Sequence, residues 1–177
     1  IYLTGRSKDL IIRSGHNIDP SIIEEAASEH PSVALSAAVG KPDSYAGELP
    51  VLFVQLKPEA TATPEELLAF LEGRISERPA LPKEVIVTTR MPLTAIGKIF
   101  KPQLRWDLAK REFARMLSPL EAKGLKVEIE VGEDKRFGTL ARIILSGLDG
   151  EPREGIEKEV KSIIEAFPFM KIDVVWK

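Results

Sequence analysis

Hydrophobic and polar positions alternate along the chain with either the period of a helix or the period of a strand, and each change of period predicts a change of secondary structure. In the first two-thirds, short apolar runs typical of buried strands alternate with amphipathic segments that carry helix start signals. Asp19 is a good N-cap before Pro20, and a capping box runs from Thr63 to Glu66 with Pro64 between them. The elements predicted here are strands over 1–4 and 10–15 that together form a small hairpin, a helix from 20, strands over 33–40 and 50–58, a helix over 61–76, a strand over 84–88 and a helix over 101–117.

The pattern changes around Ser118 and Pro119, where a second set of elements begins. Residues 125–131 alternate between apolar and polar side chains, as half-buried strands do. This part predicts strands over 125–131, 139–146 and 171–177 and, before the last strand, a helix with Ile156, Val160, Ile163, Ile164 and Phe167 on its apolar face. We therefore predict two domains, 1–118 and 119–177, the second a ferredoxin-like β-β-α-β module.

The order of these elements indicates the α+β class: a small β-hairpin, then a three-stranded sheet with helices, then the appended β-β-α-β module. Two roles are open for this module. It is either a packing or dimerisation appendage or a regulatory module that docks a partner, and it carries no ligand motif that would decide between them.

Composition narrows the classes of function. The chain has 177 residues, of which 44% are hydrophobic and 29% charged, as in a soluble globular protein. A formal net charge of -2 gives no general attraction to nucleic acid or anionic membrane, and no apolar run is long enough to span a bilayer. The absence of cysteine excludes thiol nucleophiles and disulfides and fits a cytoplasmic protein.

His16 and His30 lack the spacing of metal ligands, so no metal site is expected in this chain. The chain begins in a strand-like segment without an initiator methionine. We therefore expect it to be part of a longer protein.

The first stretch with candidate chemistry is TGRSKDLIIRSGHNIDP, residues 4–20. Gly5 and Gly15 can adopt positive φ or admit a close neighbour, and Arg6 can bind a phosphate through its forked guanidinium. Taken alone, the stretch is either a hairpin with solvated basic tips or a hairpin that handles phosphate.

The second stretch is PLTAIGKIF, residues 92–100, which places Lys98 in an otherwise apolar, turn-forming loop. An ammonium group with little competing charge nearby can stabilise negative charge on a phosphate or carboxylate in a transition state. The ordinary alternative is a β-turn with a solvated lysine.

Together the two stretches resemble one family. The block GRSKDLIIRSGHNIDPSIIEEAASEHPSVALSAAVGKPD is followed by the block PLTAIGKIFKPQLR, which begins about fifty residues later. The two blocks, their order and the distance between them resemble those in the C-terminal domain of the adenylate-forming superfamily. The second block matches the family pattern at Pro92, Thr94, Gly97, Lys98, Ile99, Lys101, Leu104 and Arg105. The superfamily includes acyl-CoA synthetases, luciferases and peptide-synthetase adenylation domains. The motif sequences in this chain are most similar to those of bacterial fatty-acyl-CoA synthetases. The resemblance covers roughly residues 1–117.

The resemblance implies a reaction in two steps. Enzymes of this family join a carboxylic acid, here a fatty acid, to ATP with Mg²⁺ and release pyrophosphate, and then pass the acyl group from AMP to the thiol of CoA. A large N-terminal adenylation domain of the same full-length chain holds the acyl pocket and most contacts to ATP and Mg²⁺. The small C-terminal domain rotates between the two half-reactions, so the isolated chain is expected to be inactive.

The same resemblance implies roles for individual residues. Lys98 corresponds to the lysine of the adenylation step, and Pro92, Thr94 and Gly97 form its supporting loop. Arg6 lies near the nucleotide, Lys8 is the hinge, and Ser14, Gly15 and His16 line the tunnel for the pantetheine arm of CoA. Relatives are switched off by acetylation of the corresponding lysine, which implies a lysine acetyltransferase acting on Lys98 as a partner.

Two alternatives to a CoA synthetase remain open. The chain could belong to an acyl-AMP ligase that loads a carrier protein, in which case residues 14–16 would receive a carrier-borne pantetheine arm. It could also be a non-catalytic binding or scaffold module that needs no lysine at position 98.

Overall fold

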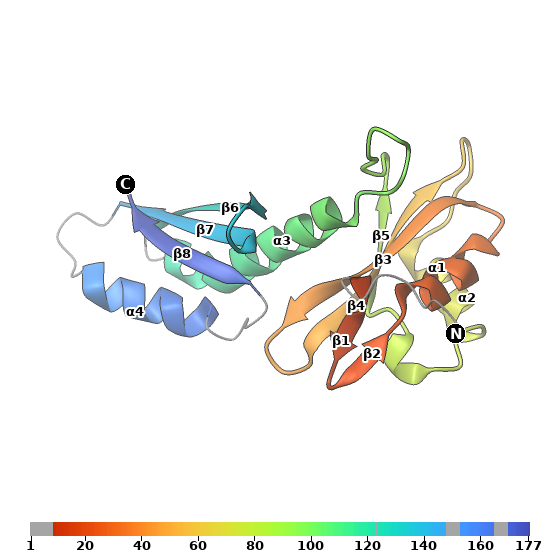
Figure 1. The fold of residues 1–177 in the computed structure, drawn as a ribbon, viewed down its shortest axis with the longest axis horizontal. Helices are drawn as coiled ribbons and strands as arrows, with labels where there is room; N and C mark the ends of the chain where they lie inside the picture. Colours follow the sequence, from red (N-terminus) through yellow and green to blue (C-terminus); the bar gives the residue numbers. More distant parts are fainter. Residues whose placement is uncertain (1–8, 123, 148–152, 165–169) are drawn as a thin grey trace. The chain divides into compact units, whose positions relative to one another are not determined.

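The structure, a computed structural model, describes residues 9–122, 124–147, 153–164 and 170–177 (Figure 1). The described residues fall into two compact units. The first contains the residues up to Lys41 and those from Ala46 to Arg105, and the second contains Pro42–Tyr45 and the residues from Trp106 onward. The α+β class is confirmed, because both units combine a sheet with helices.

The first unit is built on a five-stranded sheet with the order β2-β1-β4-β3, in which β5 also pairs with β4 in parallel. Its strands and helices are β1 (Ile11–Arg13), β2 (His16–Ile18), α1 (Pro20–Ser28), β3 (Val33–Asp43), β4 (Gly47–Leu56), α2 (Pro64–Glu72), the 3-10 turn η2 (Arg78–Ala80) and β5 (Glu84–Thr88). The expected three-stranded sheet is β3, β4 and β5, and the β1–β2 hairpin extends it by pairing Arg13 with Gly47.

Both helices of this sheet begin as their sequences predict. The Asp19 carboxylate accepts the N–H of Ser21 at 2.9 Å, and the capping box of α2 forms in full between Thr63 and Glu66. Apolar residues of α1 and α2, among them Ile23 and the leucines of α2, share one core with the hairpin and the sheet. Local helix signals therefore fix both starts, and the shared core holds the helices on the sheet.

Of the hairpin predicted between residues 1–4 and 10–15, residues 1–4 lie outside the described part of the chain. Among the described residues, β1 pairs with the following strand, β2, in a hairpin that the sequence did not predict. Ser14 and Gly15 connect the two strands with φ values of 48° and 82°. Two successive positive φ values characterise the tight two-residue turn that suits the twist of a hairpin.

The helix α3 (Lys101–Glu121) runs past the predicted end at 117 and contains Pro119. Proline has no N–H for the carbonyl of Arg115, four residues earlier. The Ser118 hydroxyl donates to that carbonyl at 2.9 Å, and Leu117 and Leu120 are buried in the core of the second unit. Packing and a side-chain hydrogen bond therefore carry the helix beyond the proline.

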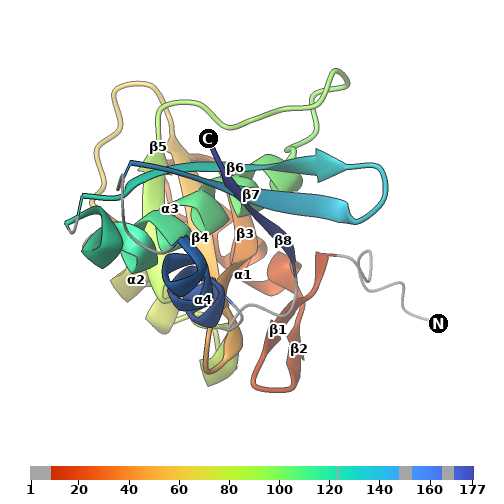
Figure 2. The same ribbon diagram turned by 90° about the vertical axis from the view of Figure 1, so that its left-hand side faces the viewer.

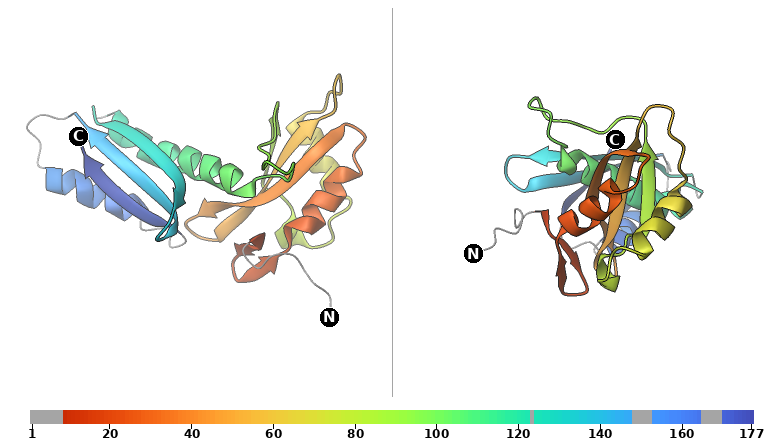
Figure 3. Two further views of the ribbon diagram at one scale, coloured as in Figure 1. Left: turned by 45° about the horizontal axis from the view of Figure 1, so that its top comes forward. Right: turned by 90° about the vertical axis from the view of Figure 1, so that its right-hand side faces the viewer.

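The second unit contains β6 (Lys126–Asp134), β7 (Gly138–Ser146), α4 (Arg153–Ile164) and β8 (Lys171–Trp176), the predicted β-β-α-β order (Figures 1 and 3). Its sheet has the order β6-β7-β8, with β7 and β8 paired in parallel. This differs from the expected ferredoxin-like sheet, in which the two strands flanking the helix are not neighbours. The predicted helix face is buried at Ile156, Val160 and Ile164, whereas Phe167 lies outside the described residues.

The division between the units also lies earlier than the predicted boundary at 118. Ala109, Phe113 and Leu117 of α3 are buried with the inward-facing residues of β6, β7 and α4. The greater part of α3 therefore belongs to the core of the second unit. No helix among the described residues is long and apolar enough to cross a membrane.

Candidate functional site

Lys98 lies on a loop between β5 and α3 whose backbone is closed by its own hydrogen bonds (Figure 1). The N–H of Thr94 donates to the carbonyl of Lys98 at 2.7 Å, and the N–H of Gly97 donates to the carbonyl of Thr94 at 2.9 Å. The N–H of Lys98 in turn donates to the Thr94 hydroxyl at 3.1 Å. Gly97 has a φ of 78°, a conformation that favours glycine. Thr94 and Gly97 therefore shape the turn from which the lysine projects.

Two further contacts anchor this loop at its base. The N–H of Phe100 donates to the carbonyl of Pro92 at 2.8 Å, and the N–H of Met91 donates to the side-chain oxygen of Gln55 at 2.7 Å. Gln55 lies at the end of β4, and Met91 is buried. The loop is thus fastened to one end of the central strand.

The Lys98 side chain is exposed, and within the described part of the chain no carboxylate forms an ion pair with its ammonium group. Its apolar neighbours are also uncovered, since Ile96 is 78% exposed and Leu93 51% exposed. An ammonium group held on an ordered turn, without an internal counter-ion, is available to an anion supplied from outside this unit.

The second candidate group, Ser14, Gly15 and His16, lies at the tip of the β1–β2 hairpin, and all three residues are exposed. The N–H of Ser14 donates to the carbonyl of Ala46 at 2.7 Å. The Arg13 guanidinium donates to the carbonyl of Pro79 at 2.7 Å. These contacts fasten the hairpin to the start of β4 and to η2.

The structure does not bring the two candidate groups together. The hairpin pairs with β4 at Gly47, whereas the lysine loop is fastened at Gln55 near the other end of the same strand. Eight residue steps along a strand correspond to roughly 25 Å. Figures 1 and 2 show the β1–β2 hairpin and the β5–α3 loop at opposite ends of the first unit.

Arg6 and Lys8, the predicted nucleotide and hinge residues, lie outside the described residues. The guanidinium of Arg105 donates to the carbonyl of Asp9, the first described residue, at 3.2 Å and lies 3.5 Å from its carboxylate. Lys101 forms an ion pair with Glu24 at 2.7 Å. Sequence reasoning matched Lys101 and Arg105 to the second motif block but did not find these partners, which are distant in sequence.

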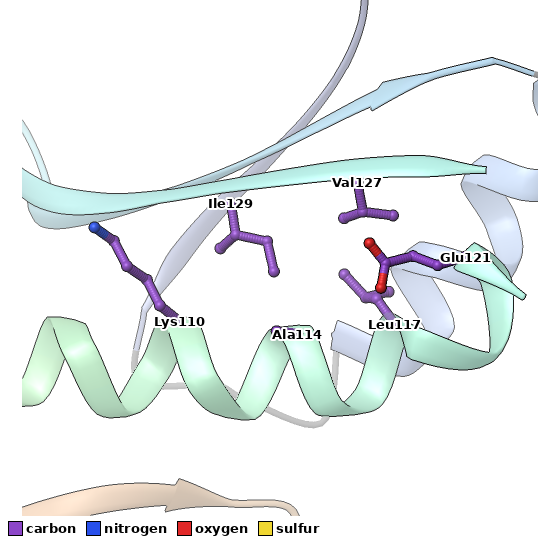
Figure 4. Close-up of a pocket in the computed structure, with 6 residues that line it drawn as sticks. All are labelled: Lys110, Ala114, Leu117, Glu121, Val127 and Ile129. Carbon is purple, nitrogen blue, oxygen red and sulfur yellow. The ribbon is translucent and has the colours of Figure 1, made fainter.

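A groove of about 250 Å³ lies in the second unit, between α3 and β6 (Figure 4). Its lining is mostly apolar, with one charged side chain at each end: Lys110, Ala114, Leu117, Glu121, Val127 and Ile129. None of the candidate functional residues lines this groove. Among the described residues, no group of three or more histidine or acidic side chains is placed to hold a metal ion.

The fold of the first unit is similar to that of the C-terminal domain of adenylate-forming enzymes. Residues 22–98 match the family described as "AMP-binding enzyme C-terminal domain". This match confirms the resemblance that the two motif blocks predicted.

The relatives are acyl-CoA ligases. The chain is 40% identical over 169 residues to marinolic acid–CoA ligase from Pseudoalteromonas sp., an alignment that covers 96% of the chain and 26% of the relative. It is 42% identical over 103 residues to long-chain-fatty-acid–CoA ligase from Bacillus subtilis, covering 58% of the chain and 18% of the relative. The first alignment extends into the second unit of the chain.

The chain is also similar in fold and sequence to solved structures of such enzymes. The chain is similar to the crystal structure of ATP-bound MatB from Rhodopseudomonas palustris, with a TM-score of 0.58 and 31% identity over 61% of the chain and 21% of that protein. The chain therefore spans about a quarter or less of the relatives it matches.

Proposed function

We propose that the chain is the mobile C-terminal domain of an AMP-forming acyl-CoA synthetase and works with an N-terminal adenylation domain of the same protein. The observation that carries this proposal is the placement of the Lys98 loop and the β1–β2 hairpin at opposite ends of one unit. Two groups roughly 25 Å apart along one strand cannot contact a single reacting centre together. A domain that turns between two half-reactions can present them in succession.

In the first half-reaction, an oxygen of the substrate carboxylate attacks the α-phosphorus of ATP, and the bond to pyrophosphate breaks. Both reactants are anions, so their approach is opposed by charge. The Lys98 ammonium between them lowers this repulsion and stabilises the charge of the transition state. Its exposed side chain and closed backbone turn fit this task, because the group is preorganised and has no internal counter-ion in the described residues.

In the second half-reaction, the thiol sulfur of CoA attacks the acyl carbon, AMP leaves, and the thiol proton is released. Ser14, Gly15 and His16 at the exposed hairpin tip line the path of the pantetheine arm in this proposal. Among the described residues, apart from the two chain neighbours of Gly15, no heavy atom lies within 4 Å of the position that a Cβ on Gly15 would take. The tip is thus open for a narrow chain to pass.

The remaining components come from outside the chain. ATP and its Mg²⁺ are bound mainly by the adenylation domain, together with the acid, which we propose to be a fatty acid because of the match to the Bacillus subtilis ligase. Acetylation of Lys98 by a lysine acetyltransferase would remove the ammonium charge and stop the first half-reaction.

ATP–pyrophosphate exchange tests the dependence on the adenylation domain. The chain alone is expected to show no exchange with any acid, and the full-length protein is expected to exchange with its fatty acid. Robust exchange by the chain alone contradicts the proposal. Supplying the full-length protein with CoA and with a pantetheine-bearing carrier protein then separates a CoA synthetase from a carrier-loading ligase.

A further inference from the structure

The β1–β2 hairpin is a small element that depends on a few contacts for its position. Each of its strands has three residues, and the tip with Ser14 and Gly15 is exposed. A short hairpin of this kind is marginally stable without packing or further hydrogen bonds. The contacts along its β1 edge therefore act together with the buried Ile11 and Ile18 and the Arg13–Pro79 hydrogen bond to determine where residues 14–16 lie.

One of these contacts comes from a side chain. The carboxylate of Glu48 accepts the backbone N–H of Ile12 through Oε2 at 2.8 Å. Beside it, Arg13 pairs with Gly47 and the N–H of Ser14 donates to the carbonyl of Ala46. Glu48 thus continues the attachment of β1 to β4 by one residue, with a carboxylate in place of a backbone carbonyl.

Gly40 on β3 makes room for this carboxylate. Gly40 is buried and has no positive φ, so its backbone alone does not require glycine. A Cβ at this position would lie 2.5 Å from both Cδ and Oε1 of Glu48. Any larger residue at position 40 would therefore displace the carboxylate.

We infer that Glu48, seated over Gly40, is a positioning residue for the thioester half-reaction. Its carboxylate holds the β1 strand and thereby fixes the exposed tip, residues 14–16, against which the pantetheine arm is aligned. Glu48 acts through the hairpin, whereas the Lys98 loop is fastened at the other end of β4 and does not depend on it. The inference rests on the proposed function, because it assigns the tip to the thiol step.

Hydrogen exchange on the chain tests the local part of the inference. Removing a hydrogen bond to a charged group is expected to speed exchange of the Ile12 amide about tenfold in Glu48→Ala. Gly40→Ala is expected to give a similar increase, because it moves the carboxylate while leaving the charge in place. Glu48→Gln keeps an acceptor oxygen and is expected to restore slow exchange. Glu84→Ala, which removes a carboxylate paired with Lys41 on the same sheet, is the matched control and leaves Ile12 unchanged.

Kinetics on the full-length enzyme test the functional part. Glu48→Ala and Gly40→Ala are each expected to raise KM for CoA about tenfold, with Glu48→Gln within about twofold of wild type. ATP–pyrophosphate exchange is expected to stay within about twofold in all three, a separation that a general loss of folding would not give. The double variant, with both Gly40→Ala and Glu48→Ala, is expected to have the same KM for CoA as either single variant, because both substitutions act on the same carboxylate.

An unchanged KM for CoA in both Glu48→Ala and Gly40→Ala would overturn the inference about Glu48 but not the proposed function. An equal loss of both half-reactions in these variants would do the same. A wild-type full-length enzyme that exchanges pyrophosphate but forms no thioester with CoA overturns the proposed function instead. In that case the Ile12 amide still reports whether Glu48 holds the hairpin.

Discussion

At the residue scale, Lys98 is defined by the backbone that carries it. The turn from Thr94 to Gly97 is closed by hydrogen bonds at both ends, and the lysine follows it directly. A flexible side chain on an ordered turn reaches a limited region, so its charge arrives at a defined place. This positioning is what an electrostatic role in catalysis requires.

The positive φ of Gly97 gives the first residue-scale prediction. In the part of the chain that the structure describes, no heavy atom beyond the two chain neighbours lies within 4 Å of a Cβ at this position, so Gly97→Ala suffers backbone strain without a clash. We expect a loss of about 1 kcal/mol in the free energy of unfolding, measured by urea denaturation, or an equivalent rearrangement of the loop that weakens adenylation. Gly73→Ala is the control, because Gly73 has an ordinary φ of -79° and should tolerate alanine. Equal effects of the two substitutions contradict the account.

Lys98 and Gly97 could be proposed as candidates from the sequence because their signals are local and part of a motif. Glu48 carried no such signal. Its bond to Ile12 joins residues 36 positions apart and depends on Gly40 on a neighbouring strand. Such a contact follows from strand register, which a single sequence does not specify between distant segments.

At the element scale, prediction was most accurate where both the start and the stop of an element are encoded locally. The strand over 84–88 was confirmed, as were the caps at Asp19 and Thr63. The β1–β2 pairing was not predicted, because a Ser-Gly turn with two positive φ values is a weaker signal than the usual Asn-Gly.

The end of α3 was placed too early because the hydrophobic pattern changes around Ser118 and Pro119, whereas the helix continues to Glu121. We expect Pro119→Ala to stabilise the chain by about 1 kcal/mol, since alanine restores the N–H donor to the Arg115 carbonyl within the helix. Urea unfolding measures the change. Pro102→Ala in the first turn of the same helix is the control and should bring no gain, because proline suits that position. A loss of stability in Pro119→Ala would show that the proline is favourable where it stands.

At the scale of the whole molecule, the sequence predicted two domains and placed the helix over 101–117 in the first, whereas most of α3 belongs to the second unit. The amphipathic pattern of α3 shows that it is buried, but it does not show which core buries it. Phe113 and Leu117 pack with the second sheet, so the division lies near 105. The opposite placement of the two candidate loops could not be predicted either, because it depends on how β1 and β5 both pair with β4.

The central claim is that this domain supplies one loop to each half-reaction, and Lys98→Ala in the full-length protein tests it most directly. Adenylation is measured by ATP–pyrophosphate exchange, and thioester formation by CoA consumption from supplied acyl-AMP. We predict a loss of at least about a hundredfold in the first rate, as expected when a preorganised electrostatic group is removed, and little change in the second. An equal loss in both rates, or full adenylation without the lysine, would contradict the account.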